Sequence, residues 1–237
     1  MNRENILQSL AGIRGYLFKA LGVAVISASV SFIFSKDLIR LLLKSVHIQL
    51  YYLSFPEVFL ATVELAMYAG VFFAAPFLIY LIWHEFHAST ALTRTQGYAF
   101  ILFSILLFYA GSVFCYYVVL PSGISFLLGY GTGHIKAMIS VQRFVVFCAA
   151  MIFAFGVTFE VPIILLILSK LGIVKSKTLV RTRRYAILFI TIASALITPT
   201  PDIYNMMLLA VPTYVLFEIG ILLMKISERK GKGATKE

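Results

Sequence analysis

The sequence predicts an all-α, polytopic membrane protein with six transmembrane helices. Three observations indicate this class: the composition, the length of the apolar runs and the position of the charges. Of the 237 residues, 61% are apolar and 13% are charged, whereas soluble domains hold about 45–50% apolar residues. The mean hydropathy is +0.95. Most apolar residues gather in runs of about 20, which cross the bilayer core as one helix. We therefore expect residues 1–237 to form a single integral membrane domain.

Six apolar segments follow one another along the chain, between a polar head and a basic tail. The head, residues 1–15, has apolar residues at every third or fourth position, which predicts an amphipathic helix on the membrane surface. The tail, residues 225–237, is basic and is expected to be disordered. The expected spans cover about residues 16–34, 58–83, 97–120, 144–168, 185–197 and 203–224.

The connections between the spans carry their own local signals. Residues 35–55 repeat apolar side chains at helical spacing, which predicts a second interfacial helix. Pro56 and Glu57 then begin the second span, because proline fits a first helical turn and glutamate suits the positive end of the helix dipole. Pro121 is expected to end the third span. A glycine-rich loop over residues 122–142 leads into the fourth.

The fifth span, residues 185–197, is unusually short. Its 13 residues extend about 20 Å as a helix, whereas the hydrocarbon core is about 30 Å thick. Such a mismatch is met by local thinning of the bilayer or by neighbours that cover the helix. We hypothesise that a thin, wet groove forms beside this span and lets a polar group enter from one side.

Lysine and arginine are distributed unevenly between the two membrane faces. With the N-terminus in the cytoplasm, fifteen of them lie in the inner segments and five in the outer segments. The inner loop over residues 170–184, which we call the basic loop, alone holds six of them and no acid. This bias predicts that both termini are cytoplasmic. Topology also explains the net charge of +10, which therefore does not indicate nucleic-acid binding.

The fourth span contains a carboxylate and a proline in its middle. Glu160 is costly in hydrocarbon, by at least about 2–3 kcal/mol, and such a residue usually faces a protein interior or a wet cavity. Pro162 lacks an N–H and presses against the Thr158 carbonyl, which predicts a bend. The simpler interpretation is that Glu160 only hydrogen-bonds a neighbouring helix. We favour a functional role, because an intramembrane acid is a candidate functional site by default.

Two more acids lie in apolar surroundings. Glu64 lies about two turns inside the second span. Glu218 lies near the inner end of the sixth span, where pairing with Lys225 or with a residue of the basic loop is expected. An alternative function follows, namely a small proton-coupled secondary transporter or channel with Glu64 and Glu160 as relay carboxylates. No inverted repeat, which is typical of such transporters, is apparent in the sequence.

The sequence offers little for enzymatic chemistry. His84, Glu85 and His87 suggest an intramembrane hydrolase, but zinc proteases place the two histidines four residues apart rather than three. There is no phosphate-binding Walker loop and no serine-nucleophile motif. Cys115 and Cys148 lie in apolar runs and are expected to pack as small apolar residues. We therefore expect no enzymatic activity, no cofactor and no metal site.

A set of motifs resembles the TatC family, the receptor subunits of the twin-arginine protein translocase. The stretch FAFGVTFEVP, residues 153–162, resembles the fourth helix of that family. The match covers most of the chain, because further segments agree in order and spacing. These are Arg183-Arg184-Tyr185, Thr198-Pro199-Thr200-Pro201-Asp202, Leu208 to Gly220, Phe108 to Pro121, Phe55 to Phe59 and Leu10 to Leu17.

The resemblance implies a glove-shaped fold and a role in protein export. The protein would be a receptor and scaffold of the cell inner membrane that binds twin-arginine signal peptides of folded precursors. It would assemble with TatA- and TatB-like single-span subunits, as a homo-oligomer within a larger complex in contact with membrane lipid. The proton gradient would drive transport. The residues expected to make intramembrane polar or partner contacts are Glu160, Pro162, Asp202 and Glu218.

Signal recognition in this family uses glutamates of the head and of the first cytoplasmic loop, which pair with the two arginines of the signal. In this sequence Gly12 and Thr93 occupy the matching positions, and Leu81 stands where a glutamine is usual. The remaining candidate signal-peptide contacts are Arg14, Glu85 and Arg94, with Glu4 as a second acid.

Overall fold

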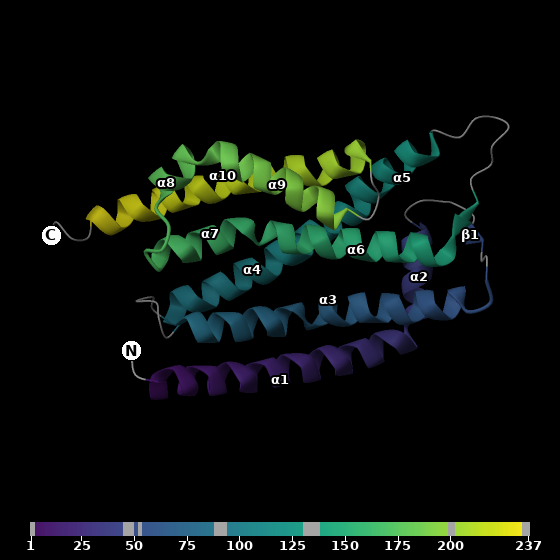
Figure 1. Ribbon diagram of the computed structural model, residues 1–237, viewed down its shortest axis with the longest axis horizontal. Coiled ribbons are helices and arrows are strands. Elements are labelled where there is room, and N and C mark those ends of the chain that lie inside the picture. The colour runs from purple at the N-terminus through teal and green to yellow at the C-terminus, as the bar shows by residue number, and fades with distance from the viewer. Residues whose placement is uncertain are drawn as a thin grey trace.

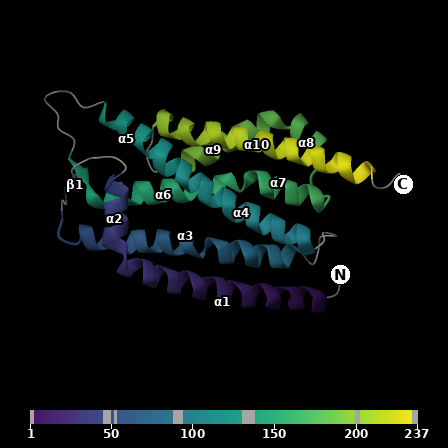
Figure 2. The ribbon, with the colours of Figure 1, turned by 180° about the vertical axis from the view of Figure 1, so that it is seen from behind.

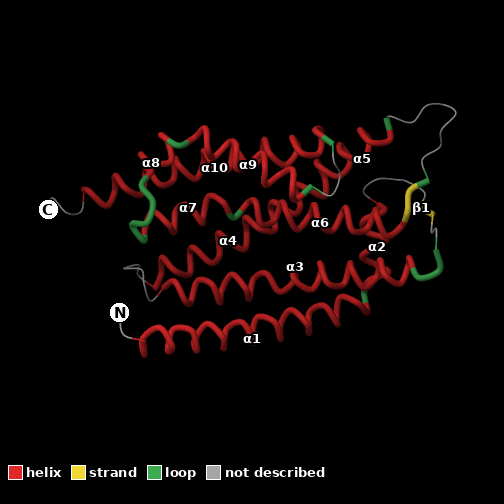
Figure 3. Tube along the Cα trace, in the orientation of Figure 1, coloured by secondary structure: helices red, strands yellow, loops and turns green. Residues whose placement is uncertain are grey.

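The computed structural model is a bundle of helices, most of which run along its longest axis (Figure 1). The structure describes residues 3–44, 50–51, 54–87, 94–129, 138–198 and 202–233. Within these ranges almost all of the chain is helical, and two short strands lie at one end (Figure 3). In chain order the elements are α1 Arg3–Ile33, α2 Ser35–Lys44, β1 Leu50–Tyr51, α3 Glu57–His87, α4 Arg94–Phe114, η1 Cys115–Val119, α5 Leu120–Leu128, β2 Ile139–Ser140, α6 Val141–Phe159, α7 Val161–Lys170, α8 Ser176–Arg181, α9 Arg183–Ile197 and α10 Ile203–Gly233.

Both ends of the described chain lie at the same end of the bundle. The start of α1 and the end of α10 lie there together with α8, and the two opposite views agree on this (Figures 1 and 2). We call this the terminal end. The other end, which we call the distal end, carries α2 and β1 (Figure 1). α4 crosses the bundle obliquely between the two ends (Figure 2).

Four helical stretches in the described part of the chain are long and apolar enough to cross a membrane. Phe18–Ile33 and Ser35–Lys44 meet at a bend of 73° and make a fifth if they form one broken span. α9 has only 15 residues and corresponds to the short fifth span that the sequence predicts. The total of six spans therefore stays a prediction, with α9 as the sixth candidate. The four long stretches are Glu57–Leu81, Gly97–Leu128, Val141–Lys170 and Ile203–Glu228.

The head differs from the expected separate surface helix. α1 runs from Arg3 to Ile33 without a break, so the head forms the first part of one long helix. No proline interrupts this stretch, and a continuous helix keeps backbone hydrogen bonds that two separate helices would lose at their ends. α2 occupies the first half of the range predicted for the interfacial helix, and residues 45–49 lie outside the described residues.

Pro121 does not end the third predicted span, contrary to the expectation from the sequence. α4 continues into the π-helix η1, and the Leu120 N–H donates to the carbonyl of Cys115, five residues earlier. Pro121 then falls in the first turn of α5, where a missing N–H is tolerated. The helix therefore continues to Leu128.

Apolar side chains form two clusters inside the bundle. The larger one joins α2, α3, η1, α5 and α6 around the fully buried Met151 and Phe155. Both cysteines are buried free thiols of this cluster. The smaller cluster joins α9 and α10, with flanking residues of α7, around Ile190, Phe217 and Ile221.

Glycines allow neighbouring helices to approach closely. A methyl group added to Gly70 of α3 would lie 2.6 Å from the Cα atom of Ala28 on α1. A methyl group added to Gly220 of α10 would lie 3.2 Å from the Cα atom of Pro162 on α7. Membrane helices pack through such small residues, because lipid removes the hydrophobic driving force between helices.

A buried acid connects two helix starts at the distal end. Glu57, the first residue of α3, is 4% exposed. Its carboxylate accepts hydrogen bonds from the Ser54 N–H at 3.2 Å, from the Ser140 hydroxyl and from the Gln142 N–H at 3.4 Å. The predicted helix start at Pro56 and Glu57 is confirmed. The same carboxylate also holds the start of α6, beside the parallel pairing of β1 with β2.

Candidate functional site

Glu160 lies at the joint between α6 and α7. α6 ends at Phe159 and α7 begins at Val161, so the predicted interruption of the fourth span is present. The Glu160 N–H donates to the Val157 carbonyl at 3.1 Å, a tighter turn than the α-helix makes. Pro162, which is fully buried, supplies no N–H to the preceding turn. The two helices nevertheless form one span of 30 residues, so the joint lies within the span.

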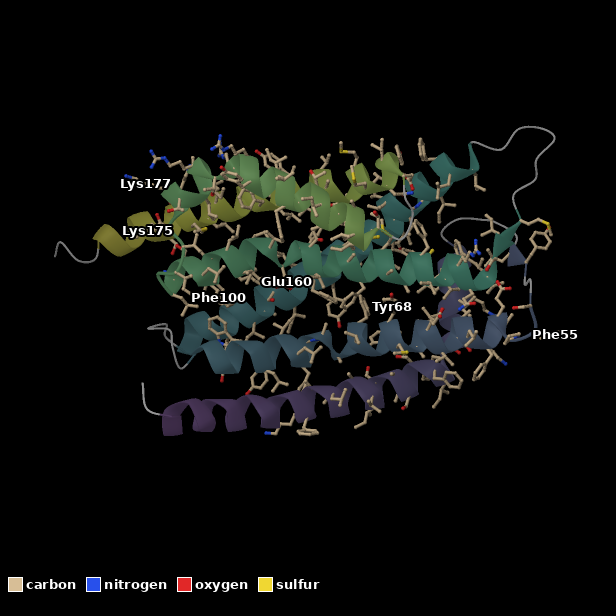
Figure 4. The ribbon with its side chains drawn as sticks, in the orientation of Figure 1. Phe55, Tyr68, Phe100, Glu160, Lys175 and Lys177 are labelled. Atoms are coloured by element: carbon tan, nitrogen blue, oxygen red, sulfur yellow. The ribbon has the colours of Figure 1, made fainter. Side chains whose placement is uncertain are left out.

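The two carboxyl oxygens of Glu160 have different surroundings. Oε2 accepts a hydrogen bond from the hydroxyl of Ser104 on α4, a serine that is 6% exposed. Oε1 is enclosed and has no hydrogen-bond partner among the described residues. Figure 4 shows Glu160 midway along the bundle. The hydrogen bond to a neighbouring helix, which is the simpler interpretation of Glu160, is therefore present at Oε2. Oε1 has no donor among the described residues.

Two glycines bring α4 and α6 together beside this pair. A methyl group added to Gly156 would lie 2.8 Å from both the Phe108 ring and the Ser112 hydroxyl. One added to Gly111 would lie 2.7 Å from the Phe155 carbonyl oxygen. The close approach of these helices allows the short Ser104 side chain to reach Glu160, a contact that spans 56 residues of sequence.

An apolar cavity of about 320 Å³ lies between α2, α3, α6 and the helix formed by α4 and η1. Aromatic and aliphatic side chains form its wall, with the Ser112 hydroxyl among the few polar groups. A second cavity of about 290 Å³ shares Tyr116 and Tyr117 with the first and adds Lys44 at the distal end. Because they share lining residues, we call the two cavities together the apolar recess, with the ammonium group of Lys44 at one end. The residues that identify the larger cavity include Leu41, Tyr68, Phe72, Ser112, Tyr116 and Phe153.

Glu64 belongs to a separate polar group at the distal end. Its Oε1 atom accepts a hydrogen bond from the Gln142 side chain at 3.0 Å, and its Oε2 atom has no partner among the described residues. Gln142 and Glu160 are 18 residues apart on α6 and α7, which is about 27 Å along the helix. Glu64 and Glu160 therefore share no partner in the described chain, and a direct proton relay between them is not supported.

Glu218 and Asp202 form hydrogen bonds with residues of α10, and Glu218 also pairs with α9. The Glu218 carboxylate accepts from Arg183 at 2.7 Å and from the Tyr214 hydroxyl at 3.0 Å. The predicted pairing of Glu218 with a residue of the basic loop is thus confirmed. Asp202 precedes α10 and accepts from both the backbone N–H of Asn205, at 2.7 Å, and its side-chain amide, at 2.9 Å. Asp202 therefore caps the start of α10.

The candidate signal-peptide contacts lie outside the side chains that the structure describes. The backbone of Arg14 lies in α1, that of Glu85 in the last turn of α3 and that of Arg94 at the start of α4. The last two positions are at the terminal end (Figure 1). The side chains of His84 and His87 are likewise outside the described residues. Among the described residues, no group of three or more metal-ligating side chains is close enough to hold an ion.

Comparison with known proteins identifies the family that this chain resembles. The family model described as "TatC: Sec-independent protein translocase protein (TatC)" matches residues 8–212. The Sec-independent protein translocase protein TatC of Aquifex aeolicus is 32% identical over 241 residues, which cover 98% of this chain and 99% of that protein. The TatC protein of Akkermansia muciniphila is 38% identical over 191 residues, which cover 76% of this chain and 53% of that protein.

The solved structures agree with the sequence match. A crystal structure described as the twin arginine translocase receptor TatC in DDM superposes with a TM-score of 0.84 at 29% identity, covering 91% of this chain and 98% of that chain. The matched segments span 53–65% of the length of three curated relatives. The chain therefore belongs to the TatC family of Sec-independent protein translocase proteins and has that family's polytopic, all-α integral membrane fold.

Proposed function

We propose that this protein is the receptor and scaffold subunit of a twin-arginine translocase. It binds the signal peptides of folded precursor proteins, assembles with TatA- and TatB-like single-span subunits, and supports export driven by the proton gradient. Membership of the TatC family over residues 8–212 carries this proposal. The protein acts as a transport subunit rather than an enzyme, and several copies work within a larger complex in the cell inner membrane.

The Glu160 joint is the intramembrane contact point in this proposal. One carboxyl oxygen is held by Ser104, and the other is enclosed without a donor. A buried acceptor without a partner is unfavourable, so a donor from a signal peptide or a partner helix would gain a hydrogen bond there. Pro162 keeps the helix interrupted at this joint, because it leaves the preceding turn without one backbone hydrogen-bond donor.

The apolar recess beside α2 suits the apolar core of a signal peptide. Its wall is aromatic and aliphatic, and it holds about 320 Å³ in its larger part. Apolar side chains of a peptide helix would gain van der Waals contacts with this wall, which is how helices associate in lipid. Lys44 at the distal end of the recess faces away from the cytoplasm in the proposed orientation.

The terminal end faces the cytoplasm in this proposal. The basic loop, α8 and both helix ends at this side carry most of the lysine and arginine, which is the distribution that cytoplasmic segments have. In this orientation we expect Glu85 and Arg94 on the side from which a precursor arrives, and Arg14, in the first half of α1, stays a candidate contact. Glu85 is the acid for the signal arginines, because Gly12 and Thr93 offer no carboxylate.

The proposal is tested by complementation of a strain that lacks this subunit, with export of a folded twin-arginine reporter as the measurement. The wild-type chain is expected to restore export. Glu160→Ala reduces export strongly, and Glu160→Gln reduces it less because an amide still bonds Ser104. Glu64→Gln is the matched control and leaves export near the wild-type level. Failure of the wild-type chain to export the reporter, combined with a solute flux that depends on both acids, would support the proton-coupled transporter instead.

A further inference from the structure

A groove of about 440 Å³ lies between α9 and α10 towards the terminal end. Figure 1 shows these two helices side by side. Four polar side chains line the groove, namely Arg183, Tyr214, Glu218 and Lys225. Exposed apolar side chains of α10 line the same groove between Tyr214 and Lys225. These are Val215, Ile219 and Leu222, which fall on one face of the helix at spacings of four and three residues.

The polar groups of the groove leave only donors unsatisfied. Both oxygens of Glu218 already accept hydrogen bonds, one from Arg183 and the other from Tyr214. The Nε atom of Arg183 is enclosed and has no acceptor in the described chain. Lys225 has no carboxylate within ion-pair distance among the described residues. With two cations against one acid, the groove carries an excess positive charge and lacks an acceptor.

An anion is therefore the chemical partner that fits. A guanidinium N–H and an ammonium group together match a phosphate, which accepts charge-assisted hydrogen bonds from both. The groove is lined by exposed apolar side chains of α10, a helix long and apolar enough to cross a membrane, so a molecule with a phosphate and a hydrocarbon chain satisfies both the polar and the apolar lining. Anionic lipids are attracted to lysine and arginine near the membrane surface.

We propose that this groove is a specific binding site for an anionic phospholipid of the leaflet at the terminal end. The phosphate accepts from the exposed part of the Arg183 guanidinium, a side chain that is 43% exposed, and from the Lys225 ammonium group, and one acyl chain lies along Val215, Ile219 and Leu222. The lipid neutralises the excess positive charge of the groove. This inference concerns lipid alone and does not rest on the proposed signal-peptide receptor function.

The test is native mass spectrometry of the full-length protein released from bilayer nanodiscs. The discs contain phosphatidylglycerol and phosphatidylcholine with the same acyl chains, and retained lipids are counted for each variant. The wild-type protein is expected to retain phosphatidylglycerol in preference to phosphatidylcholine. Lys225→Gln breaks no pair within the described chain and is expected to weaken that retention about fivefold, the effect of losing one direct hydrogen bond to the phosphate.

Arg184→Gln is the matched control. It removes the same charge one residue from Arg183, but Arg184 lies outside the groove. Its guanidinium donates to the Tyr185 hydroxyl at 3.1 Å and lies 4.8 Å from the centre of that ring. Retention of phosphatidylglycerol is therefore expected to change by less than about twofold. Equal losses in Lys225→Gln and Arg184→Gln would overturn the proposal, because they indicate general surface attraction rather than a site.

Two further arms identify the ligand. Glu218→Gln removes the only acid of the groove, so retention of phosphatidylglycerol should rise; a fall would overturn the proposal. Soluble glycerol phosphate is expected to leave the bound lipid in place, because it lacks the acyl chain that contacts α10. Displacement by glycerol phosphate would overturn the lipid assignment in favour of a soluble anion. Thermal unfolding of each variant is recorded in the same preparation, so that loss of fold is separated from loss of lipid.

Discussion

Replacing Glu57 is expected to destabilise the distal end of the bundle more than any surface substitution. The side chain is 4% exposed and accepts hydrogen bonds from Ser54, Ser140 and Gln142, and so joins the starts of α3 and α6. Hydrogen bonds to a charged group contribute about 1.5–3 kcal/mol each, and donors left without an acceptor in a buried site cost a similar amount. With two of the three bonds counted, Glu57→Ala should lower the free energy of unfolding by about 3–6 kcal/mol.

The size of this effect is measured against two further variants in detergent micelles, with the free energy of unfolding from denaturing-detergent titration. Glu57→Gln keeps one acceptor oxygen and should lose about 1–3 kcal/mol. Asp37→Asn is the control, because Asp37 pairs with Arg40 at 3.1 Å on a surface where the two side chains are 68% and 78% exposed. That exposed pair should contribute less than about 0.5 kcal/mol. The reasoning is refuted if Glu57→Ala and Asp37→Asn unfold with the same free energy.

Three further predictions concern the joint and the short helix. Ser104→Ala leaves Glu160 without its described hydrogen-bond donor and should reduce export of the reporter. Ser104→Thr keeps the hydroxyl and should not reduce export. Equal export by the two variants would show that transport does not need this hydrogen bond. Gly156→Ala puts a methyl group 2.8 Å from the Phe108 ring and should lower the free energy of unfolding by about 1–3 kcal/mol; an unchanged titration midpoint contradicts the close packing. Lengthening α9 by one apolar turn should reduce export if a thinned bilayer beside it is needed, and wild-type export of that variant would count against the thinning.

Composition and local sequence signals were sufficient for the membrane class and for several helix boundaries. Apolar content and run length do not depend on which helices pack together, so they predict spans directly. The start of α3 at Glu57 and the interruption at Glu160 are also predictable from the sequence. Each lies next to a proline, Pro56 or Pro162, and a proline affects the backbone hydrogen bonds of its own helical turn. The pairing of Glu218 with the basic loop was predictable because few opposite charges were within reach.

Contacts between distant segments were not readable from one sequence. Ser104 is one serine among several in apolar runs, and only the oblique path of α4 brings it to Glu160. The prediction that Pro121 ends its helix is wrong for a related reason. A proline ends a regular α-helix, but the π-helical turn of η1 shifts the hydrogen-bond register so that Pro121 begins a new helical segment. Such a shift is not visible in the periodicity of apolar residues.

The chemistry around Glu160 argues against a purely stabilising role. A buried polar pair is often replaceable by well-packed apolar residues without loss of stability, so stability alone does not explain a carboxyl in the middle of a span. The glycines at 111 and 156 already allow α4 and α6 to pack closely without it. Ser104 satisfies one oxygen and leaves Oε1 enclosed without a donor. An acid that adds cost and keeps an acceptor without a donor supports the proposal that a donor arrives from another molecule, such as an inserted peptide.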